Sequence, residues 1–139
     1  MEITKINRLI NTICIQADTF PEGIQDAYKR LEILVPDSSR RQHYGISYGD
    51  NGGRIIYKAA AEELHEGEAQ QLGAESFTIE KGIYLTVTIK DWMKDIPSIG
   101  KTFDELLKDS RVDKNGYCIE KYINDRDMLC MVKLKQEEK

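Results

Sequence analysis

Glu120 is the side chain with the clearest potential for chemistry, because it stands among aromatic and apolar residues. The segment 116–124 reads Gly-Tyr-Cys-Ile-Glu-Lys-Tyr-Ile-Asn and follows a turn signal, Asp-Lys-Asn-Gly. Its aromatic and β-branched residues predict a β-strand. Side chains alternate between the faces of a strand, so Cys118, Glu120 and Tyr122 share one face. That face holds either a solvated carboxylate or the single charge at the bottom of an aromatic pocket.

A carboxylate inside aromatic walls selects a positively charged ligand. An ionised carboxylate only accepts hydrogen bonds, and each aromatic face attracts a cation by roughly 0.5–2 kcal/mol. Burying a carboxylate without a partner is costly, which favours a functional role for Glu120 over a packing role. Trp92 and Tyr57 are candidate wall residues, although each also suits a position in the core.

Other kinds of site find little support in the residue types. The two histidines, His43 and His65, have no partner at metal-ligand spacing. The three cysteines, Cys14, Cys118 and Cys130, contain no Cys-x-x-Cys pair, which predicts free thiols. We therefore expect neither a metal nor a cofactor.

Composition predicts one soluble globular domain over residues 1–139. The sequence is 40% hydrophobic and 32% charged with a net charge of −4, and no apolar run is long enough to span a bilayer. Acidic and basic residues are interspersed without a basic stripe, so neither direct nucleic-acid binding nor a membrane role is expected. The N-terminus has no basic region followed by an apolar segment, which predicts a cytoplasmic location.

Periodicity predicts two similar sets of elements. Strands alternate with period two, and helices repeat apolar residues every three or four positions. The predicted elements are strands at 9–16, 43–48 and 54–61, a helix at 24–34, and then strands at 82–89, 116–124 and 128–134 with a helix that starts near 95–97. The segment 62–78 is expected to be a charged connection without an assigned structure. The Gly-rich stretch 49–53 lies between two strands and predicts a hairpin turn rather than a phosphate-binding loop.

The two halves have the same order of elements, strand-helix-strand-strand. Leu9 and Gly82 are 73 positions apart, Tyr48 and Tyr122 are 74 apart, and Ile55 and Met128 are 73 apart. This near-constant offset indicates an internal duplication. The predicted fold is α+β, with duplicated β-α-β-β modules over about 5–61 and 79–135, antiparallel sheets that form a central cleft, and helices on the outer faces.

The duplication also predicts which residues of the first half face Glu120. An offset of 74 makes Tyr44, Ile46 and Tyr48 equivalent to the three residues Cys118, Glu120 and Tyr122. We expect both sets to line one cleft. The full predicted ligand site is Glu120, Trp92, Tyr48, Tyr44, Tyr122, Tyr57, Ile46 and Cys118.

Two motifs carry a resemblance to a known family. The sequence has Gly-x-Tyr at 82–84 and Glu-x-Tyr at 120–122. With the order of elements, these motifs resemble the effector-binding domain of multidrug-responsive bacterial transcription activators, which also occurs as stand-alone gyrase-inhibitor-like (GyrI-like) proteins. The family's usual Pro ahead of the Glu is missing, and the last strand ends Val-Lys-Leu at 132–134 instead of Ile-Pro.

The resemblance implies an SHS2-like fold with Glu120 at the floor of a cleft that takes lipophilic cations. The leading hypothesis is a stand-alone small-molecule-binding protein that acts as a sensor or sequesters its ligand. The candidate protein partners are a transcription regulator and DNA gyrase. One alternative is a hydrolase of small electrophilic compounds, in which Glu120 is the general base and Tyr122 or Tyr48 stabilises developing charge. The other alternative is a protein-interaction module of the gyrase-inhibitor type.

Overall fold

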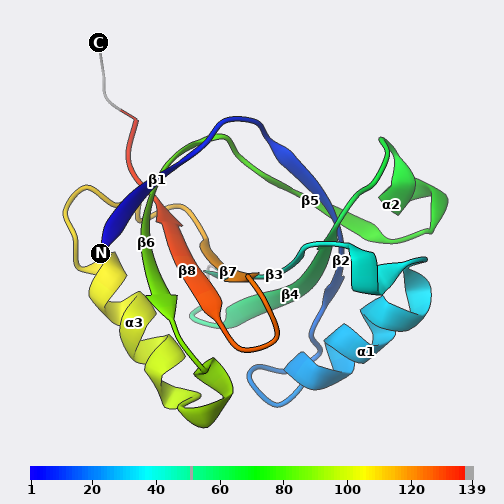
Figure 1. The fold of residues 1–139 in the computed structure, drawn as a ribbon, viewed down its shortest axis with the longest axis horizontal. Coiled ribbons are helices and arrows are strands. Elements are labelled where there is room, and N and C mark those ends of the chain that lie inside the picture. The colour runs from blue at the N-terminus through cyan, green and yellow to red at the C-terminus, as the bar shows by residue number, and fades with distance from the viewer. Residues whose placement is uncertain (51, 137–139) are drawn as a thin grey trace.

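The computed structural model describes residues 1–50 and 52–136, which form eight strands, three α-helices and two short 3-10 helices (Figure 1). In chain order the elements are β1 (Glu2–Ile6), β2 (Ile10–Gln16), α1 (Ile24–Leu34), η1 (Ser38–Arg40), β3 (His43–Gly49), β4 (Ile55–Glu62), α2 (Glu68–Gln71), β5 (Glu75–Ile79), β6 (Gly82–Ile89), η2 (Trp92–Lys94), α3 (Pro97–Leu107), β7 (Cys118–Tyr122) and β8 (Met128–Lys133).

All eight strands belong to one antiparallel sheet with the order β1-β6-β8-β7-β3-β4-β2-β5. The strands β1 and β2 follow each other in the chain with only residues 7–9 between them, yet β1 is the first strand of this order and β2 the seventh. So short a link requires the sheet to curl until its two edges approach each other, as Figure 1 shows. The result is a half-barrel with a hollow face and an outer face.

The predicted duplication of β-α-β-β modules is present. The first module is β2-α1-β3-β4 and the second is β6-α3-β7-β8. They meet at the pairing of β3 with β7 in the middle of the sheet, and outwards from this pair the order is β4, β2, β5 on one side and β8, β6, β1 on the other. This arrangement relates the modules by an approximate two-fold axis.

The outer face of the sheet carries both long helices. The helix α1 packs on β2 and β4, with Ala27 and Leu31 buried against Ile13 and Tyr57. The helix α3 packs in the same way on β6 and β8. The central strands β3 and β7 therefore lie between the two helices on this face. The hollow face has its own core, in which residues from β2, β3, β4, β6, β7 and β8 meet.

The segment 62–78, to which the sequence assigned no structure, contains α2 and all of β5 except its last residue, Ile79. Two hydrogen bonds of 2.6 Å each join the Arg41 guanidinium to the Glu68 carboxylate, and both side chains are buried. This pair ties α2 to the segment that precedes β3. The strands β1 and β5, which the sequence did not predict, are five-residue edge strands, and pairing with β6 and β2 holds each of them.

No helix within these described ranges is both long enough and apolar enough to cross a bilayer.

Candidate functional site

The strand β7 places Glu120 on the outer face, at the centre of the gap between the helices. The turn before it is held by the backbone N–H of Gly116, which donates to the Asp113 carbonyl over 3.1 Å. β7 pairs with β3 on one side and with β8 on the other. Side chains alternate along the strand, so Cys118, Glu120 and Tyr122 share one face, as predicted, and that face is the outer one that carries the helices.

The carboxylate of Glu120 is held by two phenols. Tyr57 on β4 donates its hydroxyl to Oε1 over 2.6 Å, and Tyr122 donates to the same oxygen over 2.8 Å. Burial raises the pKa of Glu120 above its ordinary value, and the two hydrogen bonds oppose this rise by stabilising the charged form. Within residues 1–50 and 52–136, Oε2 accepts no hydrogen bond. It is therefore the oxygen available to a ligand.

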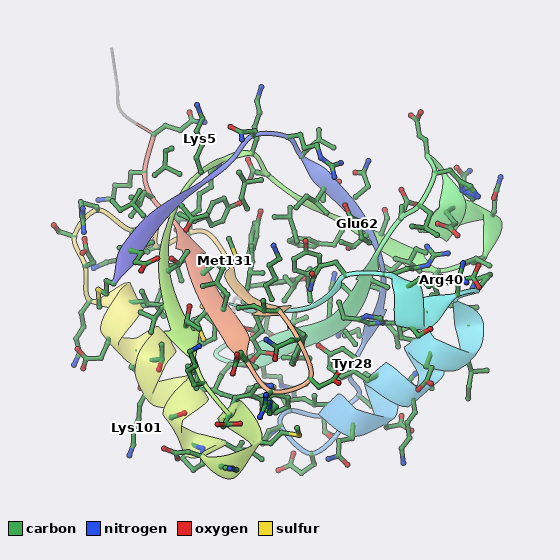
Figure 2. The ribbon with its side chains drawn as sticks, in the orientation of Figure 1. Lys5, Tyr28, Arg40, Glu62, Lys101 and Met131 are labelled. Carbon is green, nitrogen blue, oxygen red and sulfur yellow. The ribbon has the colours of Figure 1, made fainter. Side chains whose placement is uncertain are left out.

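A third phenol, Tyr28 on α1, completes the cluster. Its hydroxyl donates to the backbone carbonyl of Tyr44 over 2.9 Å and lies 3.0 Å from the hydroxyl of Tyr57. Burial is the main cause that raises the pKa of Tyr28, Tyr57 and Tyr122, so all three stay neutral and can donate. Tyr28 can be seen between α1 and the middle of the sheet in Figure 2.

Gly45 makes room for this cluster. It is the direct partner of Glu120 in the pairing of β3 with β7. A Cβ atom at this position would overlap both the Tyr57 hydroxyl and Oε1 of Glu120. A glycine is therefore required if the phenol is to reach the carboxylate across β3.

These residues form the floor of a cavity of about 440 Å³ between α1 and the segment from η2 to α3. Its lining is mostly apolar and aromatic, and Glu120 is the one acidic residue in it; neither Lys nor Arg is part of the lining that the structure describes. The lining residues are Pro21, Ile24, Gln25, Tyr28, His43, Tyr57, Trp92, Ile96, Ile99, Glu120 and Tyr122.

Trp92 forms the wall opposite α1. Its ring meets that of Tyr122 edge to face, with centroids 5.6 Å apart, and its backbone N–H donates to the Arg126 carbonyl over 3.1 Å. The indole Nε1 is buried and has no acceptor in the described chain. Phe20 stacks on the cavity residue Tyr57 with centroids 5.9 Å apart, and the lining residue Ile96 is 59% exposed. The opening of the cavity is therefore apolar as well.

His43 contributes no positive charge to the wall. Its Nδ1 lies 3.0 Å from the Arg41 carbonyl and its Nε2 lies 3.0 Å from the Ser38 hydroxyl. Burial is the main cause that lowers its pKa, which favours the neutral ring. Nδ1–H then donates to the carbonyl, and Nε2 accepts from the hydroxyl.

Four of the eight predicted site residues line this cavity: Glu120, Trp92, Tyr57 and Tyr122. Cys118 is on the same face but packs into the core beneath α3. The prediction missed Tyr28, which the helical period assigns only to a buried stripe. The available signal was its hydroxyl, because a phenol on a buried stripe needs a polar partner.

The expectation that Tyr44, Ile46 and Tyr48 share the cleft of Glu120 is wrong. All three point to the hollow face, where Tyr44 and Ile46 are core residues and Tyr48 packs against them. The offset of 74 that equated these residues with Cys118, Glu120 and Tyr122 is the source of the error. A shift of one residue moves a side chain to the other face of a strand. The pairs that face each other across β3 and β7 are Gly45 with Glu120 and Ser47 with Cys118.

Nucleophilic and metal chemistry find no support at this site. Burial is the largest cause that raises the pKa of the thiol of Cys118 to about 11, and those of Cys14 and Cys130 to about 12. These thiols are protonated at neutral pH. In the part of the chain that the structure describes, no cluster of three His, Cys, Asp or Glu residues could hold a metal ion.

No protein-family model matches the sequence, and no curated protein matches it. Solved structures share its fold. An integron cassette protein of Vibrio cholerae, VCH_CASS2, has a TM-score of 0.70 at 11% identity, with 96% of this chain and 95% of that chain covered. The protein SAV2435, solved with bound tetraphenylphosphonium, has a TM-score of 0.65 at 9% identity, with 96% and 93% covered. A Staphylococcus aureus MU50 protein named for bacterial transcription regulation has a TM-score of 0.58 at 8% identity, with 97% of each chain covered.

Proposed function

We propose that this protein binds a lipophilic cation in the cavity between α1 and α3, with Glu120 as the counter-charge. The observation that carries the proposal is the free Oε2 of a half-buried carboxylate in a lining that contains neither Lys nor Arg. A buried ionised carboxylate without a cationic partner is unfavourable. A ligand that brings a positive charge removes this cost, whereas a neutral ligand of the same shape does not.

The rest of the lining suits the apolar part of such a ligand. The cavity volume of about 440 Å³ lies within the range of small-molecule pockets, roughly 300–1,000 Å³. Trp92 and Tyr122 offer ring faces and edges, and a cation near a desolvated ring gains about 2 kcal/mol. The phenols of Tyr57 and Tyr28 are neutral, so they add no competing charge.

The fold comparison supports this proposal. SAV2435 carries tetraphenylphosphonium, which is a lipophilic cation, on a chain with the same fold. At 9% identity the similarity concerns the fold alone. The positive charge of tetraphenylphosphonium is complementary to the half-buried Glu120 carboxylate of this chain. We infer a GyrI-like protein that senses or sequesters its ligand. The Staphylococcus aureus protein named for transcription regulation, which shares the fold, supports the sensor role.

Tetraphenylphosphonium is a suitable probe, because Trp92 is the only Trp of the chain and lines the cavity. We expect its emission to change saturably on titration, with one ligand per chain by calorimetry. Triphenylphosphine oxide, a neutral aromatic phosphorus compound, serves as the control and should bind more weakly. Equal affinity for the neutral compound, or a calorimetric signal that leaves Trp92 emission unchanged, would contradict the proposed site.

A second candidate function is hydrolysis of a small electrophilic compound. The observation that favours it is the carboxylate with a raised pKa beside two phenol donors, since a general base works best with a pKa near the working pH. Turnover of an ester and epoxide library tests this candidate. Product formation that disappears in Glu120→Gln while tetraphenylphosphonium binding weakens would favour the enzyme, and binding without turnover would favour the sensor.

A further inference from the structure

The hollow face of the sheet holds a second cavity, of about 300 Å³, on the opposite side of β7 from Glu120. The strands β1 and β5 stand at the two ends of the strand order, yet residues of both line it, together with residues of the turn between β1 and β2. The cavity therefore exists only because the sheet curls. Its volume is at the lower end of the range for small-molecule pockets.

Apolar side chains make up the floor and the walls of this cavity. Ile79, Ile119 and Met131 form the buried floor. Ile6 and Ile10 are half-buried and form the walls near the turn. Figure 2 shows Met131 on the hollow side of the sheet, beneath the arch formed by the ends of the sheet. A ligand for this surface needs an apolar portion.

Polar groups without partners are found at one end of the cavity. Tyr44 is only 4% exposed, and its hydroxyl makes no hydrogen bond with any residue that the structure describes. Burial is the main cause that raises its pKa to about 12, so the hydroxyl keeps its proton and can donate. Lys121 is directly opposite Tyr44 in the pairing of β3 with β7, on the same face, and forms no ion pair within the described residues.

The charge of this cavity is opposite to that of the Glu120 cavity. The lining contains Lys5, Arg8 and Lys121 and no acidic residue among the part of the chain described. Arg8 is partly engaged by Glu62, at 3.4 Å. Lys5 is less relevant, because alternation along β1 turns its side chain away from the hollow side, as Figure 2 shows. Lys121 is thus the cation that an anionic ligand would meet next to the free phenol.

We propose that the hollow-face cavity binds a small amphipathic carboxylate, with its headgroup at Lys121 and Tyr44 and its apolar tail on Ile79, Ile119 and Met131. The carboxylate accepts a hydrogen bond from the phenol and from the ammonium group, and the tail covers apolar surface. The two cavities then take ligands of opposite charge, because consecutive residues of β7, Glu120 and Lys121, point to opposite faces of the sheet.

Octanoate is the probe, followed by calorimetry and by amide chemical shifts. We expect saturable binding of one octanoate per chain, shift changes on β1, β7 and β8, and little binding of acetate or of neutral octanol. Lys121→Gln should weaken binding roughly tenfold and Tyr44→Phe roughly fivefold. Lys101→Gln is the matched control, which removes the same charge from an exposed side chain on α3 outside both cavities, and should leave the affinity unchanged.

The same variants separate this site from the Glu120 cavity. Lys121→Gln and Tyr44→Phe should bind tetraphenylphosphonium as the wild type does, and saturating tetraphenylphosphonium should not displace octanoate. Displacement by tetraphenylphosphonium would place octanoate in the other cavity and overturn the proposal. Equal binding of neutral octanol, several octanoates per chain, or an affinity that both variants leave unchanged would overturn it as well.

Discussion

Glu120→Gln separates the charge of the carboxylate from its shape. The amide oxygen of Gln can still accept from the hydroxyls of Tyr57 and Tyr122, which lie 2.6 and 2.8 Å from Oε1 in the wild type. Only the charge and the free carboxylate oxygen are lost. A contact with a charged group contributes about 1.5–3 kcal/mol, so tetraphenylphosphonium should bind roughly 10–150-fold more weakly. A neutral aromatic ligand should lose much less.

The same change should leave the fold intact or stabilise it. Burial raises the folded-state pKa of Glu120 despite two hydrogen bonds to the charged form, so the ionised carboxylate is a net cost to the folded protein. Between the unfolded and folded pKa values the folded state holds more protons than the unfolded state. The free energy of unfolding of the wild type therefore rises as pH falls through the folded pKa, and the Gln variant lacks this contribution.

Ligand affinity depends on pH in the opposite direction. Protonation removes the counter-charge, so wild-type affinity for tetraphenylphosphonium should fall as pH falls through the folded pKa of Glu120. The affinity of Glu120→Gln should change little with pH. Calorimetry and Trp92 emission measure the affinities, and urea unfolding at several pH values measures the stability.

Glu66→Gln is the matched control, because it removes one carboxylate charge from an exposed position outside both cavities. It should preserve both affinity and stability. Our reasoning fails if Glu120→Gln weakens charged and neutral ligands by the same factor and also lowers the free energy of unfolding. That result would make Glu120 a structural residue that the two tyrosines require.

Two further predictions concern stability, measured by urea unfolding. Gly45→Ala should destabilise the protein by about 1–3 kcal/mol and abolish tetraphenylphosphonium binding, because the new methyl group overlaps the carboxylate cluster. The control Gly100→Ala, in α3 with open space around it, should stabilise by roughly 0.5–1 kcal/mol. An unchanged free energy of unfolding in Gly45→Ala would refute the close approach of Tyr57 and Glu120 to Gly45. Glu68→Gln should cost about 3–5 kcal/mol at pH 7, since it leaves the Arg41 charge buried, and Glu105→Gln on the surface should cost less than about 1 kcal/mol. Hydrogen bonding to Arg41 is the main cause that lowers the pKa of Glu68 to about 2. The stabilisation by the Arg41–Glu68 pair is therefore present above about pH 4.5 and is lost as pH falls towards 2. A contribution of this pair to the free energy of unfolding that is unchanged at pH 2 would contradict the prediction.

The amino-acid sequence determines the local elements and the chemistry of β7. Alternating apolar residues in β6 and the helical stripes of α1 and α3 depend on neighbours within a few positions, and their bounds agree closely with those found. The same local alternation puts Glu120 and Tyr122 on one face. Short edge strands such as β1 and β5 carry too little pattern of their own, because pairing with distant strands stabilises them.

Tertiary structure decided which residues surround Glu120. The register of β3 against β7 places Gly45 opposite the carboxylate and turns Tyr44 to the hollow face, and a difference of one residue in the offset between the halves reverses this assignment. Tyr28 reaches the cluster only because α1 packs on β2 and β4. The second cavity depends on the curl that brings the two ends of the sheet together. Pairing register and curvature arise from contacts between residues far apart in the chain, and no local pattern records them.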